Sequence, residues 1–167
     1  KRTVAIKIIN ATYAQNEAFR GQFFRDMRLL ASLEHPNLVR IYAPGYDKDV
    51  LYLVTDWVEG MNLADFLAQF ENPFLDLSDA LRFGSQLADA LHYLHDQGVE
   101  HLSIKPSNIH MCQIKEPKPP DDKSPDQPDA LIWQALFSDV GLKSLVMSAR
   151  NSEVATIEND FDYLAPE

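Results

Sequence analysis

The sequence has few of the residues on which disulfide-rich, membrane-spanning and nucleic-acid-binding proteins depend. A single cysteine, Cys112, excludes an internal disulfide framework and fits a reducing compartment. Lysine and arginine number 15 against 25 acidic residues, and the resulting formal charge of −10 argues against nucleic acid or an anionic membrane as partner. The longest apolar runs, residues 4–9 and 51–54, fall far short of the roughly 20 residues of a membrane span. We therefore expect a cytoplasmic segment without a membrane helix.

What is present suits one globular domain, with 46% hydrophobic residues in 167. The β-branched run at residues 4–9 predicts a strand, followed by a polar turn over 10–16. A helix is predicted over residues 17–33, because apolar residues recur there at spacings of three and four. That stripe consists of Phe19, Phe23, Met27, Leu30 and Leu33.

The middle of the chain predicts a hairpin followed by two helices. Strands are expected at residues 38–42 and 51–55, joined through Pro44-Gly45 and Asp47-Lys48-Asp49. Asn62 is a candidate cap for a short helix that runs to Phe70. The clearest helix is expected to start at Ser78 and to stop at Gly98. Its predicted inward face consists of Ala80, Leu81, Gly84, Leu87, Ala88, Leu91 and Leu94.

The last third predicts two short strands around a polar loop. The strands are expected at residues 109–114 and 131–137, and the segment 116–130 between them, EPKPPDDKSPDQPDA, reads as a solvated insertion. Residues 142–162 have little periodicity and predict a long loop. Helices and strands segregated in this way indicate an α+β fold with two lobes, and not a βαβ sheet.

Six short motifs occur in an order and spacing that resemble the eukaryotic-type Ser/Thr protein kinases. They are Val4-Ala5-Ile6-Lys7, His35-Pro36-Asn37, residues 51–56, His101 with Lys105 and Asn108, Asp139-Val140-Gly141, and Tyr163-Leu164-Ala165-Pro166-Glu167.

The resemblance implies a partial bilobal kinase-like fold over residues 1–167. Residues 1–55 would belong to the N-lobe, 56–60 to the hinge and 61–167 to the C-lobe, with the insertion at 116–130. The chain would be a piece of a longer one, running from the strand of the phosphate-binding lysine to the Ala-Pro-Glu motif, without the family's glycine-rich loop.

The same resemblance assigns ATP and Mg²⁺ as cofactors and places them on particular residues. Lys7 would hold the α- and β-phosphates and pair with Asp26, where the family has glutamate. Lys105 would face the γ-phosphate, and Asn108 and Asp139 would bind the metal, which prefers oxygen ligands. Four further residues would surround the nucleotide: Ala5, Asp56, Val58 and His110, the last where the family has an apolar residue.

The chain departs from the family at the position that accepts the substrate proton. The family has aspartate there and this chain has Ser103, whose hydroxyl is too weak a base at neutral pH. A general base contributes roughly 10²–10⁴-fold. Leu102 replaces an arginine, Val140 replaces a phenylalanine, and Asp160 stands where the family has threonine. We hypothesise that Asp160 contacts Ser103. The alternative is that Asp160 acts as a displaced base.

Three functions are compatible with these residues. The first is a catalytically impaired kinase-like module, a pseudokinase, that binds ATP and Mg²⁺ and acts through protein partners. The second is an active but unorthodox Ser/Thr kinase with protein substrates. The third is a structural interaction domain without nucleotide. Ser103 and Leu102 favour the first over the second, and Lys7 and Asp139 favour it over the third. The oligomeric state stays open.

Overall fold

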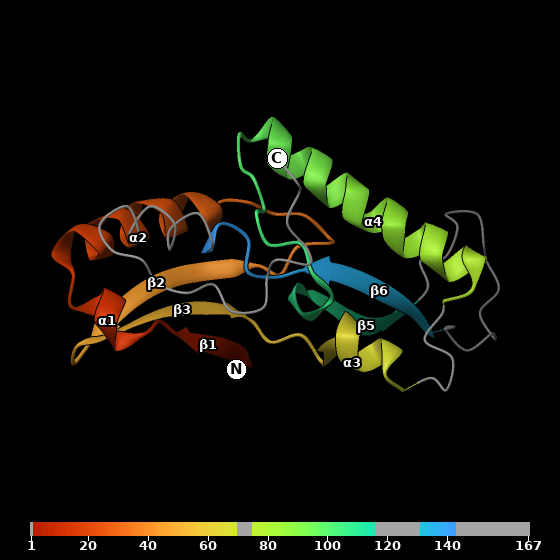
Figure 1. The fold of residues 1–167 in the computed structure, drawn as a ribbon, viewed down its shortest axis with the longest axis horizontal. Coiled ribbons are helices and arrows are strands. Elements are labelled where there is room, and N and C mark those ends of the chain that lie inside the picture. The colour runs from red at the N-terminus through yellow and green to blue at the C-terminus, as the bar shows by residue number, and fades with distance from the viewer. Residues whose placement is uncertain (1, 70–74, 116–130, 143–167) are drawn as a thin grey trace.

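The computed structural model describes residues 2–69, 75–115 and 131–142. Two three-stranded antiparallel sheets are its main elements, one with strand order β1-β3-β2 and the other with order β4-β5-β6. Helix α2 lies along the first sheet and helix α4 along the second (Figure 1). Helices and strands are segregated along the chain, so the predicted α+β class is confirmed.

The first sheet is built from β1 (Val4–Ile8), β2 (Ile41–Asp47) and β3 (Val50–Asp56), with β3 in the centre. Lys48 and Asp49 join β2 to β3 and have φ of 46° and 64°. Two consecutive positive φ values are typical of the tight hairpin turns that match strand twist. The predicted strands at residues 4–9 and 51–55 are confirmed to within one or two residues.

The prediction that the strand at residues 38–42 stops before Pro44 was wrong. Strand β2 begins at Ile41 and continues through Pro44 and Gly45 to Asp47. Proline is tolerated because β2 is an edge strand, where a missing N–H costs no ladder bond on the open side. Gly45 is required because Tyr52, its partner on β3, covers it: an added Cβ would lie 2.2 Å from a ring carbon.

Helix α1 (Ala11–Ala14) occupies the segment predicted as a polar turn, and α2 (Glu17–Leu30) follows it. The two asparagines that suggested a turn are helix caps instead. The Asn10 side chain accepts from the Thr12 N–H at 2.9 Å, and that of Asn16 accepts from the Phe19 N–H at 3.0 Å. The apolar stripe of α2 is confirmed, since all five of its predicted members are buried.

The second sheet carries the C-terminal motifs. Its strands are β4 (Gly60–Asn62), β5 (Ile109–Lys115) and β6 (Leu131–Phe137), and the last two confirm the predicted strands. Asn62 caps α3 (Leu63–Leu67), as predicted, by accepting from the Asp65 N–H at 2.8 Å. A 3-10 turn, η1 (Pro106–Asn108), leads into β5.

Helix α4 (Leu77–Asp96) confirms the predicted long helix, with Asp76 rather than Ser78 as its cap. The predicted inward face was correct only in part. Leu94 is buried and Leu87 and Leu91 pack against the core, whereas Leu81 is 65% exposed. Phe83 and Ala90, which were not predicted to face inward, are buried. Apolar residues lie on two sides of this helix, and periodicity could not tell which side packs against β6. Gly98 follows the helix with a φ of 70°, which confirms the predicted stop.

The His-Pro-Asn turn after α2 joins the two sheets. The Phe137 N–H donates to the Asn37 carbonyl and the Val39 N–H to the Phe137 carbonyl, both at 2.8 Å. The buried Asn37 side chain donates to the Ala135 carbonyl at 2.8 Å, and His35 stacks on Tyr93 of α4. The end of α2 is therefore fixed to β6, the strand that leads to Asp139.

Some predictions are not tested by this structure. The division into residues 1–55, 56–60 and 61–167 stays a prediction. The insertion at 116–130, Asp160 and the Tyr163–Glu167 motif lie outside the described residues. Within the described residues, no helix combines the length and apolar character that crossing a bilayer requires.

Candidate functional site

A cleft of about 500 Å³ contains most of the residues that the sequence assigned to the nucleotide. Its volume lies within the range of small-molecule sites. Both sheets contribute to it, because β1 and β3 meet the loop after β6 at this point. The predicted site residues that line it are Ala5, Lys7, Asp56, Val58, His110 and Asp139.

The charged groups of this cleft pair differently from the expectation. The Lys7 ammonium forms an ion pair with the Asp139 carboxylate. Asp26 accepts instead from the Gln22 side-chain amide, at 2.6 Å. The predicted Lys7–Asp26 pair is therefore wrong for this conformation. Asp139 has a φ of 62°, a left-handed conformation that aspartate adopts more readily than most residues.

The segment from His101 to Asn108 folds as a compact hydrogen-bonded unit around Asn108. This side chain is buried, and its Nδ2 donates to the Ser103 carbonyl at 2.9 Å and to the Ser103 Oγ at 3.0 Å. The backbone carbonyl of Asn108 accepts from the Ser138 N–H at 2.9 Å. Ser103 thus occupies the position of the missing acid as an acceptor for Asn108. Lys105 directly precedes η1 and is half-buried.

His101 is the buried centre of this loop. Its side chain is 2% exposed and its ring packs edge-on against Phe137, with centroids 4.6 Å apart. Burial lowers the pKa of His101, which keeps the imidazole neutral. Val140, Leu30 and Ile41 are buried as well.

His110 lies in the centre of the second sheet, opposite Asn62 on β4 and Leu136 on β6. It is half-buried, and desolvation lowers the pKa of His110, an effect that Asp139 opposes and Lys7 reinforces. A neutral imidazole therefore lines the cleft where the resemblance implied an apolar side chain. Such a ring offers one donor and one acceptor.

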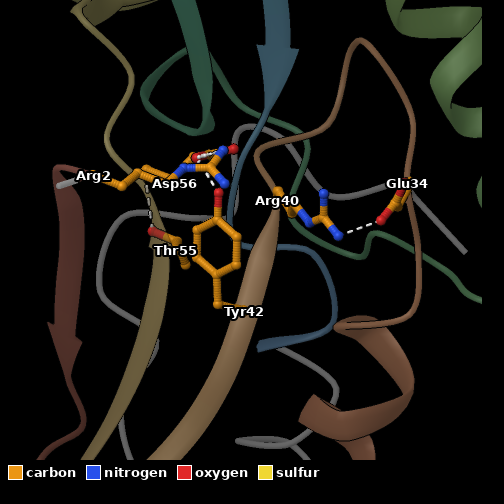
Figure 2. Close-up of polar contacts among 6 residues, drawn as sticks. All are labelled: Arg2, Glu34, Arg40, Tyr42, Thr55 and Asp56. Carbon is orange, nitrogen blue, oxygen red and sulfur yellow. Dashed lines mark hydrogen bonds and ion pairs between the residues drawn. The ribbon is translucent and has the colours of Figure 1, made fainter.

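The carboxylate of Asp56, the last residue of β3, is bound by Arg2 and by Tyr42 on β2 (Figure 2). Arg2 forms an ion pair with Asp56 at 3.0 Å, and the Tyr42 hydroxyl donates to the same oxygen. Arg2 and Arg40 also lie over the Tyr42 ring, at 4.7 and 5.6 Å from its centroid. Burial and the bond to Asp56 raise the pKa of Tyr42. The Asp56 carboxylate is thus engaged by protein groups.

Several cleft residues were missed by the sequence analysis. They are Ile6, Val39, Ile41, Leu53, Thr55, Trp57, Gly60, Met61, Asn62, Asp65, Ser107, Ser138, Val140 and Leu142. Asn62 was identified only as a helix cap. In the Asp139-Val140-Gly141 motif, Asp139 was assigned to the metal and Val140 was noted only as a replacement of phenylalanine. No local pattern indicates that β4 and α3 lie at the edge of the cleft; that follows from the pairing of β4 with β5.

Comparisons with known proteins agree with this geometry. PrkC, a serine/threonine-protein kinase of Bacillus subtilis, is 31% identical over 169 residues, covering 99% of this chain and 22% of PrkC. The PknI kinase domain of Mycobacterium tuberculosis has a TM-score of 0.64 at 24% identity, covering 83% of this chain and 49% of that one. Rad53 in complex with AMP-PNP has a TM-score of 0.56 at 28% identity, covering 65% and 27%.

The chain therefore spans about a fifth of PrkC and about half of the solved PknI chain. The model of the protein kinase domain family matches residues 1–167, the whole chain. The chain belongs to the protein kinase domain family.

Proposed function

We propose that this kinase domain binds ATP but transfers phosphate poorly, and that it acts as a regulatory or scaffolding module for protein partners in the cytoplasm. The observation that carries the proposal is the bond from the Asn108 amide to Ser103. It gives the hydroxyl a structural partner at the place where the family has a general base. The loop keeps its hydrogen-bonded conformation, while the carboxylate that would accept the substrate proton is replaced by the Ser103 hydroxyl.

The cleft supports the nucleotide part of the proposal. Lys7 would hold phosphates, and apolar groups such as Ala5 and Val58 would contact the base. The relative Rad53 has been solved in complex with AMP-PNP. The half-buried His110 would provide a polar, flat contact in the same cleft.

The metal-ligand positions fit Mg²⁺ only in part. Asp139 offers a carboxylate and Asn108 an amide oxygen, both of a kind that Mg²⁺ accepts, and the metal would neutralise charge on the phosphates. The Asp139 carboxylate is already paired with Lys7, however. A metal at Asp139 would share the carboxylate with the Lys7 ammonium, which contacts its Oδ1.

Thermal unfolding of the full-length protein tests nucleotide binding. ATP at 100 times its dissociation constant should stabilise the protein by about 2.7 kcal/mol. Lys7→Met removes the ammonium and should abolish most of that shift. Absence of a shift in the wild-type protein would instead support the structural domain without nucleotide.

A phosphotransfer assay tests the impaired chemistry. The wild-type protein should be slower than ordinary kinases, which turn over at roughly 1–100 s⁻¹, and Ser103→Asp should raise the rate. Turnover in the ordinary range would establish the second candidate, an active Ser/Thr kinase. That candidate is favoured by the names of relatives such as PrkC and by the retained Lys7, Asn108 and Asp139.

A further inference from the structure

A short chain of hydrogen bonds on the surface of α2 determines where the Asp26 carboxylate lies. Arg25 Nη2 donates to Gln22 Oε1 at 2.7 Å, and Gln22 Nε2 donates to Asp26 Oδ1 at 2.6 Å. Gln22 and Asp26 are four residues apart, the spacing at which side chains on a helix meet. The Asp26 side chain is thus fixed to its own helix, by a residue to which the sequence motifs give no role.

Asp26 and Lys7 line different cavities. Asp26 faces a cavity of about 530 Å³ between α2 and the segment after α4, together with Leu29 and Glu100. Lys7 lines the nucleotide cleft. Gly141 packs tightly against α2 at the edge of the first cavity, since an added Cβ would lie 2.7 Å from Leu30 Cδ1. The carboxylate bonded to Gln22 therefore lines a different cavity from the ammonium that it was expected to neutralise.

In this arrangement Asp139 is both the partner of Lys7 and the proposed Mg²⁺ ligand. The Lys7 ammonium takes Asp139 as its partner, and Asp139 is also the residue that the family resemblance assigns to Mg²⁺. A cation that binds Asp139 shares this carboxylate with the ammonium, which contacts its Oδ1. With Asp26 withheld, Lys7 has no second carboxylate among the described residues to which it is paired.

We propose that Gln22 is a positioning residue that withholds Asp26 from the cleft, so that Asp139 stays committed to Lys7 and Mg²⁺ adds little to nucleotide affinity. The inference rests on the proposed nucleotide binding. It concerns the metal response of that binding, which is measured separately from binding itself.

The test is the ATP dissociation constant of the full-length protein, measured by calorimetry with excess Mg²⁺ and again with a chelator. The metal response is the dissociation constant measured with the chelator divided by the dissociation constant measured with Mg²⁺. The wild-type ratio should stay within about twofold of one. Gln22→Ala releases Asp26, and Asp26→Glu adds one methylene of reach toward Lys7. Each change should raise the ratio, and the double variant should raise it about tenfold.

Two further variants separate positioning from a general effect on α2. Gln22→Lys keeps a donor at the same spacing from Asp26 and should keep the low ratio. Arg28→Ala changes the same helix at an exposed residue whose recorded contact is with the Phe24 ring, and it should leave the ratio unaltered. Unfolding midpoints without ligand verify that each variant is folded.

The possible results are distinct. A rise in the ratio for Gln22→Ala and Asp26→Glu, but not for Gln22→Lys, supports the role of Gln22. A wild-type ratio above tenfold, or ratios that do not respond to either substitution while ATP still binds, overturns it. Absence of ATP binding in all variants overturns the nucleotide proposal and, with it, this inference.

Discussion

The loop from His101 to Asn108 and the charged wall of the cleft, formed by Lys7 and Asp139, differ in how firmly their side chains are held. In the loop, Asn108 and His101 are 8% and 2% exposed, and Asn108 has several hydrogen-bonded partners. In the wall, the Lys7 and Asp139 side chains are 44% and 28% exposed and hold each other by charge. One region is part of the packed core, and the other consists of solvated ions.

The difference shows which changes each region can accommodate. A buried polar group needs a partner, so the loop keeps its shape as long as residue 103 offers an acceptor, whether carboxylate or hydroxyl. Exposed ions exchange partners at little cost. The loss of an acid at position 103 and the re-pairing of Lys7 therefore leave the fold intact, although both bear directly on chemistry.

The largest effect is expected where the loop meets the core. Phe137→Ala removes a side chain that is 1% exposed and packs on His101, and it should lower the free energy of unfolding by about 3–5 kcal/mol. Leu131→Ala is the matched control on the same strand; at 61% exposed it should change stability by about 0.5 kcal/mol or less. Urea denaturation measures both, and similar losses would show that the loop is not supported by the core.

Asn108→Ala should have the next largest effect. It leaves the Ser103 carbonyl without its donor and should cost about 1–3 kcal/mol. The exposed neighbour Ser107 provides the control, and Ser107→Ala should have little effect on the urea midpoint. If the Asn108 variant were as stable as the control, the loop would not depend on its internal hydrogen bonds.

Acidification should weaken the loop through His101. An unfolded histidine has a pKa of about 6.5, and burial lowers the pKa of His101 in the folded protein. Below about pH 6.5 the unfolded chain therefore binds a proton that the folded protein excludes, and stability falls as the pH falls toward the folded pKa.

His101→Gln removes this titration. The free energy of unfolding should then decline less steeply between about pH 7 and pH 5 than in the wild-type protein. His110, whose pKa is also lowered, supplies a remaining slope of the same sign. Equal slopes in both proteins would exclude His101 as a contributor.

The smallest effect on stability is expected in the charged wall. Lys7→Met breaks an exposed ion pair and should change the free energy of unfolding by less than about 1 kcal/mol, while it removes ATP-induced stabilisation. Arg40→Met, which breaks the exposed pair with Glu34, is a control that should leave the response to ATP intact. A loss above about 2 kcal/mol in the Lys7 variant would contradict the contrast between wall and loop.

Local sequence patterns predicted the elements more reliably than their faces or partners. The stripe of α2 and the cap of α3 were predicted correctly because each depends on residues within one or two helical turns. The inward face of α4 was predicted only in part, because that helix has apolar residues on two sides and the side that packs depends on where β6 lies.

The same limit applied to the candidate site. Motif spacing identified Lys7, Asp56, His110 and Asp139, and the structure brings them together in one cleft. Motif spacing could not decide whether Asp26 bonds to Gln22 or pairs with Lys7, because Lys7 lies on another element. The contact from Asp160 to Ser103 remains a prediction.

The sequence alone determined the α+β class, the kinase resemblance and the absence of an acid at Ser103, because these depend on residue identity and order. Only the tertiary structure decided which charges meet. Lys7 pairs with Asp139, 132 residues away, while Asp26 stays with Gln22, one helical turn away. The contact between Asp26 and Gln22 follows from helical spacing, whereas the distance between Lys7 and Asp139 is fixed by the packing of separate elements.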